Sequence, residues 1–236
     1  MAAPVDAARQ GTNVSTASTT WNVNVGSPTA GTLLIVYARF AAAPGAVTFT
    51  GYTVLGGPDA TDATDDTTTV FYRWADGTEG PTDVLSPTNS VKGCTIAWEV
   101  TGGENPAVSA PTISAVAIGT TAANSANPNS VAPAGAPRDT LYIAMAGGDG
   151  EVGAYTAFPT NYANLQAANS GTGGVAATNC FAGGASRQLT ASSSEDPGAF
   201  THGAHTTGWT AFTVAIRELI VVQLPPPSLL IPRGAL

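Results

Sequence analysis

The two histidines of this sequence lie in one short stretch, where they could act as metal ligands. His202 and His205 are three residues apart, and the carboxylates of Glu195 and Asp196 precede them. Imidazole and carboxylate groups are common ligands, but a stable site needs three or four of them in a fixed geometry. Exposed loop histidines are the simpler interpretation of this pattern, and we expect no metal here.

A second group of candidate ligands is the acidic stretch at residues 56–66 (GGPDATDATDD). Asp59, Asp62, Asp65 and Asp66 could offer a calcium ion several carboxylate oxygens on one loop. Their spacing lacks the central glycine and the terminal glutamate of an EF-hand loop. We therefore expect a solvated loop tip without bound metal.

The motifs for cofactor binding and nucleophilic catalysis are incomplete. Residues 148–153 (GDGEVG) match G-x-G-x-x-G, but Pro159 follows closely, and no acidic residue occurs between Val152 and Ser194 to bind a ribose. No G-x-S-x-G elbow is present, and no pair among the sixteen acids is singled out for glycoside cleavage. We expect a glycine-rich β loop, no cofactor and no enzymatic activity.

Tryptophan and cysteine are the remaining chemically distinctive residues. Trp74, Trp98 and Trp209 lie in or beside apolar strand-like segments, so we expect them in the core rather than as platforms for sugar rings. Cys94 and Cys180 also lie in strand-like runs, where cysteine often behaves as a small buried hydrophobe. The sequence leaves open whether these two cysteines form a disulfide.

The elements that position these residues are predicted to be strands, because the composition disfavours other classes. Only 10% of the 236 residues are charged, against about 25% in an ordinary soluble domain. Coiled coils and helical bundles need Lys, Glu and Leu on their faces, whereas this chain has one lysine, 27 glycines and 17 prolines. The class that remains is all-β.

Net charge and hydropathy also exclude several partners. A net charge of −8 argues against binding to nucleic acid or to an anionic membrane, both of which require clustered Lys and Arg. No run approaches the ~18 apolar residues of a membrane span. The first ten residues lack the apolar segment of a secretory signal, and we expect none.

Short apolar runs separated by Gly, Pro and Asp predict an antiparallel β-sandwich or barrel. No segment shows a sustained 3.6-residue apolar period, and the best helix candidate is a turn or two at residues 161–168. We expect strong strands at residues 21–25, 32–40, 48–55, 67–74, 94–100, 141–146, 174–182 and 209–217. Weaker strands are expected at residues 84–85, 113–118, 164–167 and 188–191.

A weak internal similarity relates the two halves of the chain. Residues 31–36 (GTLLIV) resemble residues 139–144 (DTLYIA), and residues 94–99 (CTIAWE) resemble residues 212–217 (FTVAIR). Two related sets of strands would explain both pairs, and shared strand composition is the alternative. We expect one sandwich body over residues 1–218, with a long connector at residues 120–138 between its halves.

The last residues, 219–236, differ in character from the body. Three consecutive prolines enforce an extended polyproline geometry, and the apolar side chains around them would be exposed unless they dock on another surface. We interpret this segment as an extended docking arm. Its predicted contact residues are Leu224, Pro225, Pro226, Pro227, Leu229, Leu230, Ile231 and Arg233.

A series of short motifs runs along the chain in an order that is more specific than any one of them. The motifs are GTLLI at 31–35, GYTVL at 51–55, FYRWADGTE at 71–79, IAWEV at 96–100, G-x-x-x-P at 102–106, DTLYIA at 139–144 and WTAFTVAIR at 209–217. This order resembles a domain of tailed-bacteriophage virion structural proteins and prophage-like genes. The resemblance covers about residues 10–218 and implies a non-enzymatic, jelly-roll-like antiparallel β-sandwich.

The resemblance implies a protein made in the host cytoplasm and located in the virion, in contact with other virion proteins and with copies of itself. A minor tail, tail-tip or fibre-base protein is the first interpretation, and a capsid decoration protein is the second. The sequence leaves the choice between head and tail open. The alternative from another class is a carbohydrate-binding module that reads host-surface glycans through Tyr155, Phe158 and Tyr162.

Overall fold

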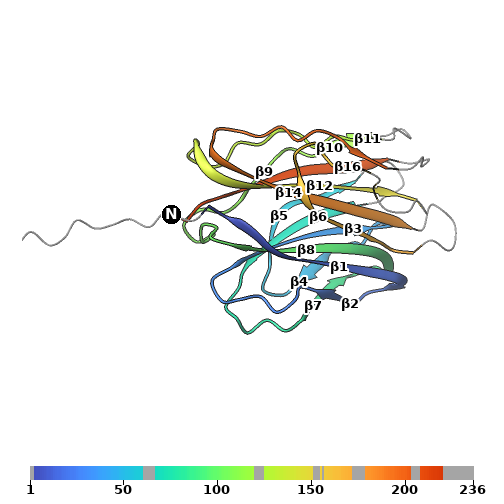
Figure 1. Cartoon of the computed structure of the whole chain (residues 1–236). Helices are drawn as coiled ribbons and strands as arrows, with labels where there is room; N and C mark the ends of the chain where they lie inside the picture. The colour runs from blue at the N-terminus through green and yellow to red at the C-terminus, as the bar shows by residue number, and fades with distance from the viewer. Residues whose placement is uncertain are drawn as a thin grey trace, which may run out of the picture.

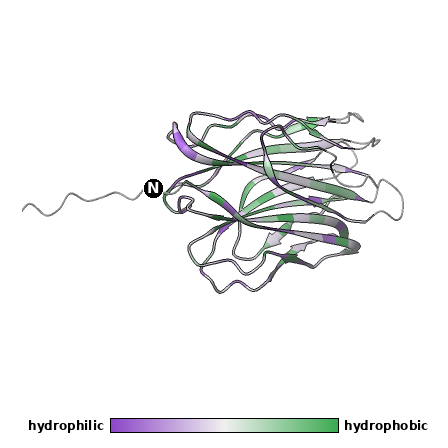
Figure 2. Cartoon of the chain, in the orientation of Figure 1, coloured by the Kyte–Doolittle hydropathy of each residue, from purple (hydrophilic) through white to green (hydrophobic). Residues whose placement is uncertain are grey.

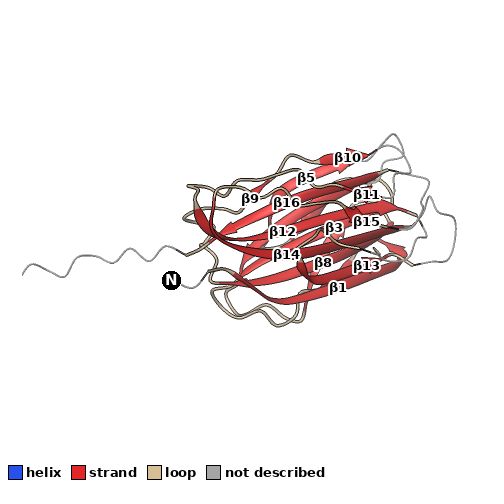
Figure 3. Ribbon diagram, turned by 45° about the horizontal axis from the view of Figure 1, so that its top comes forward, coloured by secondary structure: helices blue, strands red, loops and turns tan. Residues whose placement is uncertain are grey.

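The computed structural model of the chain describes residues 3–60, 67–119, 125–150, 155, 157–171, 179–202 and 208–219. Every regular element in this part of the chain is a strand (Figure 3). The described segments include no helix that is long and apolar enough to cross a membrane. The predicted all-β antiparallel class is confirmed.

The first of two large sheets is built from the N-terminal half. Its central strand is buried along its whole length, because Ile35 and Tyr37 face the second large sheet while Val36 and Ala38 face an outer layer. This double burial explains the continuous apolar run in the sequence. The strand order is β1 (Val5–Ser18), β8 (Val91–Thr101), β3 (Leu33–Phe40), β6 (Thr67–Trp74) and β5 (Thr53–Ala60).

The second large sheet is built from the C-terminal half and lies face to face with the first (Figure 1). Its strand order is β10 (Ala117–Gly119), β16 (Trp209–Arg217), β12 (Arg138–Asp149), β14 (Cys180–Ser192) and β13 (Ala163–Asn169). The short strand β9 (Thr112–Ile113) also pairs with β16.

Each large sheet has its own outer layer. The first is covered by a three-stranded sheet of β2 (Trp21–Asn24), β7 (Thr82–Pro87) and β4 (Val47–Phe49). The second is covered by a smaller pair, β11 (Ser125–Ala126) and β15 (Phe200–Thr201), and by an isolated bridge between Ala157 and Thr201. The molecule is therefore a stack of layers with two large sheets at its centre (Figure 1).

The two halves repeat one strand order, which is that of a jelly roll. In the first half the large sheet contains the first, eighth, third and sixth strands, and the outer sheet pairs the second, seventh and fourth. The large sheet of the second half has β10, β16, β12 and β14 where the first half has β1, β8, β3 and β6. Its outer layer has β11, β15 and Ala157 where the first half has β2, β7 and β4. The two similar sequence pairs lie on β3 and β12 and on β8 and β16, which are equivalent strands.

The halves also face one another with reciprocal contacts. Strand β1 lies against β13 at one edge of the stack, β5 lies against β9 at the other, and β3 and β12 meet at the centre. Strand β9 pairs with β16 as β1 pairs with β8, so a strand that pairs with an eighth strand meets a fifth strand at each edge. The contacts are more extensive at the β1–β13 edge, where β8 also contacts β13 and β14.

Three large apolar clusters follow from this layering. The central cluster lies between the two large sheets and contains Trp98 with no exposed surface, as predicted for a core residue. Trp74 and Trp209 are only partly buried, and they pack at the margins of two clusters. Trp21 is buried under the outer layer of the first half. In Figure 2 the apolar colour is concentrated on the strands of the stack.

Several sequence-based boundaries are corrected by the structure. The strand expected at residues 48–55 is two strands, because the chain turns at Gly51 (φ 82°) and the Tyr52 amide donates to the Phe49 carbonyl. The helix expected at residues 161–168 is wrong, and the weaker strand expected at residues 164–167 is confirmed, since β13 occupies most of that segment. Strand β1 was not predicted at all. The strand expected at residues 113–118 is divided into β9 and β10. The strand expected at residues 188–191 is part of β14, which also contains the end of the strand expected at residues 174–182.

Candidate functional site

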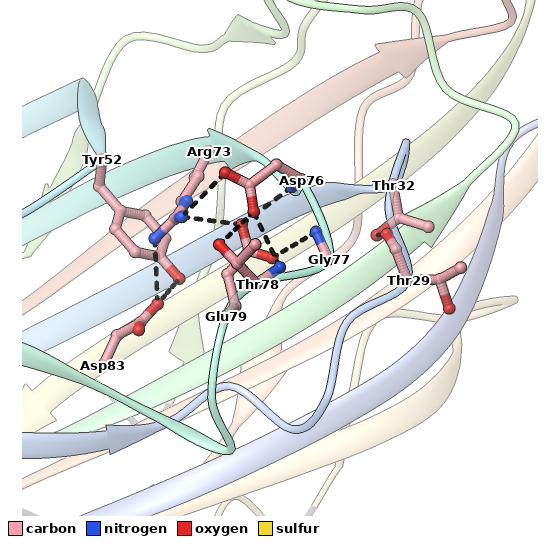
Figure 4. A network of polar contacts seen from close by, with 9 residues as sticks. All are labelled: Thr29, Thr32, Tyr52, Arg73, Asp76, Gly77, Thr78, Glu79 and Asp83. Carbon is pink, nitrogen blue, oxygen red and sulfur yellow. Dashed lines mark hydrogen bonds and ion pairs between the residues drawn. The ribbon is translucent and has the colours of Figure 1, made fainter.

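A network of polar contacts lies where β6 ends, and it is centred on Arg73 (Figure 4). The guanidinium lies 2.9 Å from Glu79, 3.6 Å from Asp83 and 3.9 Å from Asp76. It also lies over the ring of Tyr52, 5.7 Å from the centroid. One cation therefore holds together the end of β6, the loop after it, the start of β7 and the turn before β5.

The loop after β6 is the ADGTE motif of the sequence. The carboxylates of its two acidic residues accept hydrogen bonds that hold the loop in its conformation. Asp76 accepts hydrogen bonds from the amide and the hydroxyl of Thr78, at 2.8 and 2.5 Å. Glu79 accepts from the amides of Asp76 and Gly77, at 3.0 and 2.8 Å. Gly77 has φ 83°, which favours glycine. The Thr78 hydrogen bonds, with a smaller contribution from Arg73, lower the pKa of Asp76.

Tyr52 connects this network to the outer layer of the first half. Its ring stacks on Phe49 at 3.8 Å, and its hydroxyl donates to Asp83 at 2.9 Å. Burial and the adjacent Asp83 carboxylate raise the pKa of the Tyr52 phenol, so it remains a proton donor at neutral pH. The phenol is a structural donor in this position.

An open groove of about 540 Å³ lies beside the network. Tyr72 and Trp74 are alternate residues of β6, and both are half-buried against the central cluster. Arg73 and Asp76 add a donor and an acceptor to the lining. Flat aromatic surface next to a few fixed polar groups is a combination that binds small hydroxyl-rich or aromatic molecules. The complete lining is Gly51, Thr53, Tyr72, Arg73, Trp74, Asp76, Asn105, Pro106 and Ala107.

A second groove, of about 390 Å³, lies at the seam between the halves. Here Asp6 on β1 accepts from Arg9 at 2.9 Å and from the hydroxyl of Ser186 on β14 at 2.8 Å. The Asp6 side chain is only 1% exposed. Burial raises its pKa, against the lowering effects of Ser186 and Arg9. This carboxylate therefore joins the first strand of one half to the other half.

The residues considered as metal ligands are placed apart from one another. The interpretation of His202 as an exposed loop residue is wrong: it is 2% exposed and packs against Tyr155 and Phe181. Glu195 forms an ion pair with Arg187 at 2.7 Å. His205 lies outside the described residues. Within the described residues, no three His, Cys, Asp or Glu side chains are grouped closely enough to hold a metal ion.

The acidic stretch and the glycine-rich motif are only partly described. Asp59 lies near the end of β5, where burial raises its pKa, while Asp62, Asp65 and Asp66 lie outside the described residues.

Gly148, the first residue of the glycine-rich motif, belongs to β12 and pairs with β14 and β16. Asp149 next to it is buried and forms an ion pair with Arg39 of β3 at 2.9 Å. The described part of the motif is thus a strand end that contacts the other half.

The aromatic residues proposed to bind glycans lie at the outer layer of the second half. Tyr155 is 5% exposed and contacts Phe158, Phe181 and Phe200, with centroid distances of 5.1–6.3 Å. Phe158 and Tyr162 pack against the same outer layer of the second half. Tyr155 is therefore not an open platform, whereas Phe158 and Tyr162 are half-buried, as are Tyr72 and Trp74 beside the open groove.

The predicted docking residues, which run from Leu224 to Arg233, lie outside the described residues. The body ends beside the first half: Glu218 forms a bridge with Gly103, and the Leu219 amide donates to the Gly102 carbonyl at 3.0 Å. The connector expected at residues 120–138 contains β11, and Val131 pairs with Glu195, so its described part is not a simple loop.

The Arg73 network was not predicted as a site. Arg73, Asp76 and Glu79 lie within the quoted FYRWADGTE motif, so their spacing was a usable signal. Tyr52 and Asp83 come from other segments, and only the pairing of β5 with β6 and of β4 with β7 brings them close. Comparisons with protein-family models, with curated proteins and with solved structures find no match for this chain.

Proposed function

We propose that this chain is a non-enzymatic structural protein of a tailed-phage virion. A minor tail, tail-tip or fibre-base protein is the first choice, and a capsid decoration protein is the second. The observation that carries this proposal is that both jelly rolls are filled with side chains. Jelly rolls occur in viral capsid proteins, lectins and cupins, so the fold alone does not indicate the function. Whether the space between the sheets is filled with side chains is more informative.

The interior of the first jelly roll is packed with aromatic residues. Trp21 and Phe40 contact at 4.7 Å between ring centroids, and Phe49 meets Phe71 edge to face at 5.5 Å. All four rings are at most 5% exposed. A jelly roll that holds a small molecule between its sheets keeps open space there, and in this one that space is closed by four rings.

The second jelly roll is filled in the same way by different residues. Tyr155, Phe181 and Phe200 surround one another under the outer layer, and His202 joins them. The two rolls share the central cluster, so each large sheet is packed on both faces. Function is therefore expected on the outer surface, through contacts with neighbours, which is how a scaffold or displayed protein works.

Assembly in many symmetric copies fits this proposal. One extended arm binds weakly alone, and repeated copies on one particle multiply that affinity. We expect residues 224–233 to supply the contact with the neighbouring subunit, while the filled body is displayed.

Locating the chain on particles tests the proposal. Particles are purified on a density gradient from the host that carries the gene, and an antibody raised against the chain is used for immunogold labelling. We expect the chain to co-sediment with particles and the label to lie at the tail. Label on the head would favour the decoration role, and a chain that stays in the soluble fraction while particles form would contradict both.

A second candidate function has one specific observation in its favour, the groove that Tyr72 and Trp74 line. We infer that this groove takes a saccharide of the host surface, with the aromatic faces under the sugar rings and Arg73 and Asp76 bonded to hydroxyls. Isothermal titration with purified host-surface polysaccharide tests it. Trp74→Ala should weaken binding about tenfold, since such a contact contributes about 1.4 kcal/mol. Trp209→Ala is the matched control, because Trp209 is also half-buried but lies in the other half. Equal binding by the wild type and the Trp74 variant would exclude this groove.

A further inference from the structure

The two cysteines of the chain meet in the middle of the central cluster. Cys94 lies on β8 of the first half, and Cys180 is the first residue of β14 in the second half. Their sulfur atoms are 3.9 Å apart, and neither residue has any exposed surface. Both are thiols in this structure. Two residues that are 86 positions apart in sequence thus touch across the boundary between the jelly rolls.

Small residues allow the two sheets to approach closely here. On the face of β14 that carries Cys180, the next residues are Ala182 and Gly184, while Phe181 and Gly183 face the outer layer. A Cβ atom at Gly184 would overlap the ring of Trp98 on β8, and one at Gly183 would overlap the ring of Tyr155 on the other face. The chain therefore depends on glycine to bring β14 onto β8, and this approach is what places the two sulfurs in contact.

We propose that Cys94 and Cys180 form a disulfide that joins the two jelly rolls when the chain folds in the presence of a disulfide oxidant. The thiolate of one cysteine attacks glutathione disulfide, forms a mixed disulfide and releases one glutathione. The thiolate of the second cysteine then attacks the protein sulfur of that mixed disulfide and releases the other glutathione. Two protein thiols are oxidised to one disulfide, one glutathione disulfide is reduced to two thiols, and the two cysteine protons leave with the glutathione.

The position of the pair determines when this reaction takes place. The thiolate is the attacking species, and burial raises the pKa of Cys94, with the adjacent Cys180 adding to the effect. Glutathione has no path to sulfurs that are fully covered by protein. The redox state is therefore set while the chain folds and is retained afterwards, as dithiol in a reducing compartment and as disulfide in an oxidising one.

The disulfide would add a covalent link across the boundary between the halves of a duplicated fold. The two halves are held together by a shared apolar face and by edge contacts, and the chain joins them only once. A disulfide that closes a loop of this length removes much of the freedom of the unfolded chain. It would also prevent the jelly rolls from separating while each stays folded.

The test compares the full chain made in two compartments. It is expressed once in cells with an ordinary reducing cytoplasm and once in cells with an oxidising cytoplasm, and thiols are counted after denaturation. We expect two thiols in the first preparation and none in the second, with one peptide that links Cys94 to Cys180. The oxidised chain should melt several degrees higher, and the reduced chain should resist glutathione disulfide until it is denatured.

Cys94→Ala and Cys180→Ala are the matched controls, because each leaves one thiol that has no partner within the chain. Both variants should melt at the same temperature whether they come from the reducing or the oxidising cytoplasm. Two free thiols in the oxidised preparation, cross-linked dimers in place of the internal link, or an oxidised chain that fails to fold would each overturn the proposal. A reduced chain that oxidises quickly while folded would overturn the claim that folding sets the redox state.

Discussion

The two jelly rolls have the same inner sheet and different outer layers. The first covers its sheet with the three strands β2, β7 and β4. The second covers the equivalent face with the two-residue strands β11 and β15, one isolated bridge and aromatic residues from loops. The inner sheets match strand for strand, in order and in pairing.

This difference shows which constraint keeps the halves alike. Strands β3 and β12 are each packed between two apolar layers, and so are β8 and β16 for most of their length. A strand that is buried on both faces needs an apolar side chain at nearly every position. The internal sequence similarity occurs on these four strands. Each outer layer packs on the large sheet of its own half, so each can be built in its own way.

Removing the largest side chain of the shared face should have the largest effect on stability. Trp98→Ala leaves a cavity between the two sheets, and we expect a loss of about 3–5 kcal/mol in the free energy of unfolding. For a chain of this size, that is a fall in melting temperature of about 10 °C. Trp209→Ala, at the margin of the second half, should cost clearly less. Equal losses would show that the central cluster is not the principal core.

The two outer layers can be compared with a matched pair of glycines. A Cβ at Gly93 would overlap the ring of Trp21 and the backbone carbonyl of Arg39, whereas one at Gly183 would overlap the ring of Tyr155. Overpacking costs about 1–3 kcal/mol, and we expect Gly93→Ala near the upper end because β3 cannot move aside. Gly183→Ala should lie near the lower end, because a ring outside any sheet can shift. Chemical denaturation measures both, and a larger loss for Gly183 would mean that the second outer layer is the more rigid.

Much of this architecture could be predicted from the sequence because strands buried on both faces have a strong signal. Strands β3, β6 and β16 were expected almost at their observed bounds. Strand β1 was not, because its residues are mainly Ala, Gly, Thr, Ser and Asn, and it is stable only through its pairing with β8. The segment of β13 had two competing expectations, a helix at residues 161–168 and a weaker strand at residues 164–167, and the strand is the one that forms. Asn161 and Asn164 have φ values of 67° and 58°, which no helix accepts.

The candidate site was less accessible to sequence reasoning for a similar reason. The ADGTE motif is local, and its hydrogen bonds could be expected from the residue types alone. The contacts of Arg73 with Asp83 and Tyr52 depend on the register of two sheets. His202 was taken for an exposed residue because it lies in a predicted loop, whereas Phe181 from β14 and Tyr155 pack against it. Contacts between strands that are distant in sequence leave no pattern in either strand.

The seam between the halves should show a pH dependence of its own. The pKa of Asp6 is raised by burial, so the folded chain keeps this proton at a pH where the unfolded chain has lost it. Stability should therefore fall as pH rises from the usual aspartate value of 3.8 through the higher folded value. Asp6→Asn should lack this fall, as measured by denaturation between pH 3.5 and roughly 6.

Asp76, in the first half, is a control because its titration should change stability with pH in the opposite direction. Its pKa is lowered, so its contribution to stability is present at higher pH and is lost as pH falls through the folded value. Asp76→Asn should remove a loss on acidification, whereas Asp6→Asn should remove a loss on raising the pH. The same sign for both variants would show that Asp6 is not held at a buried seam.

The smallest effect on stability is expected from removing residues 224–236. Residues 224–236 follow a body whose last described contacts are those of Glu218 and Leu219 with Gly103 and Gly102. Pro225, Pro226 and Pro227 stiffen the segment, so little freedom remains to be lost when it docks. Leu229, Leu230 and Ile231 would bury about 200–300 Å² of apolar surface on a neighbour, or roughly 5–7 kcal/mol before the costs of association.

Deleting residues 224–236 should leave the melting temperature of the body unchanged and abolish its incorporation into particles. Replacing Leu229, Leu230 and Ile231 together by Ser is the matched variant, because it keeps the length and the prolines while removing the apolar contact. Occupancy is measured by quantitative immunoblotting of purified particles, with an internal virion protein as reference. Full occupancy by the truncated chain would place the attachment surface on the jelly rolls, and their exposed outer layers would then be the first surfaces to mutate.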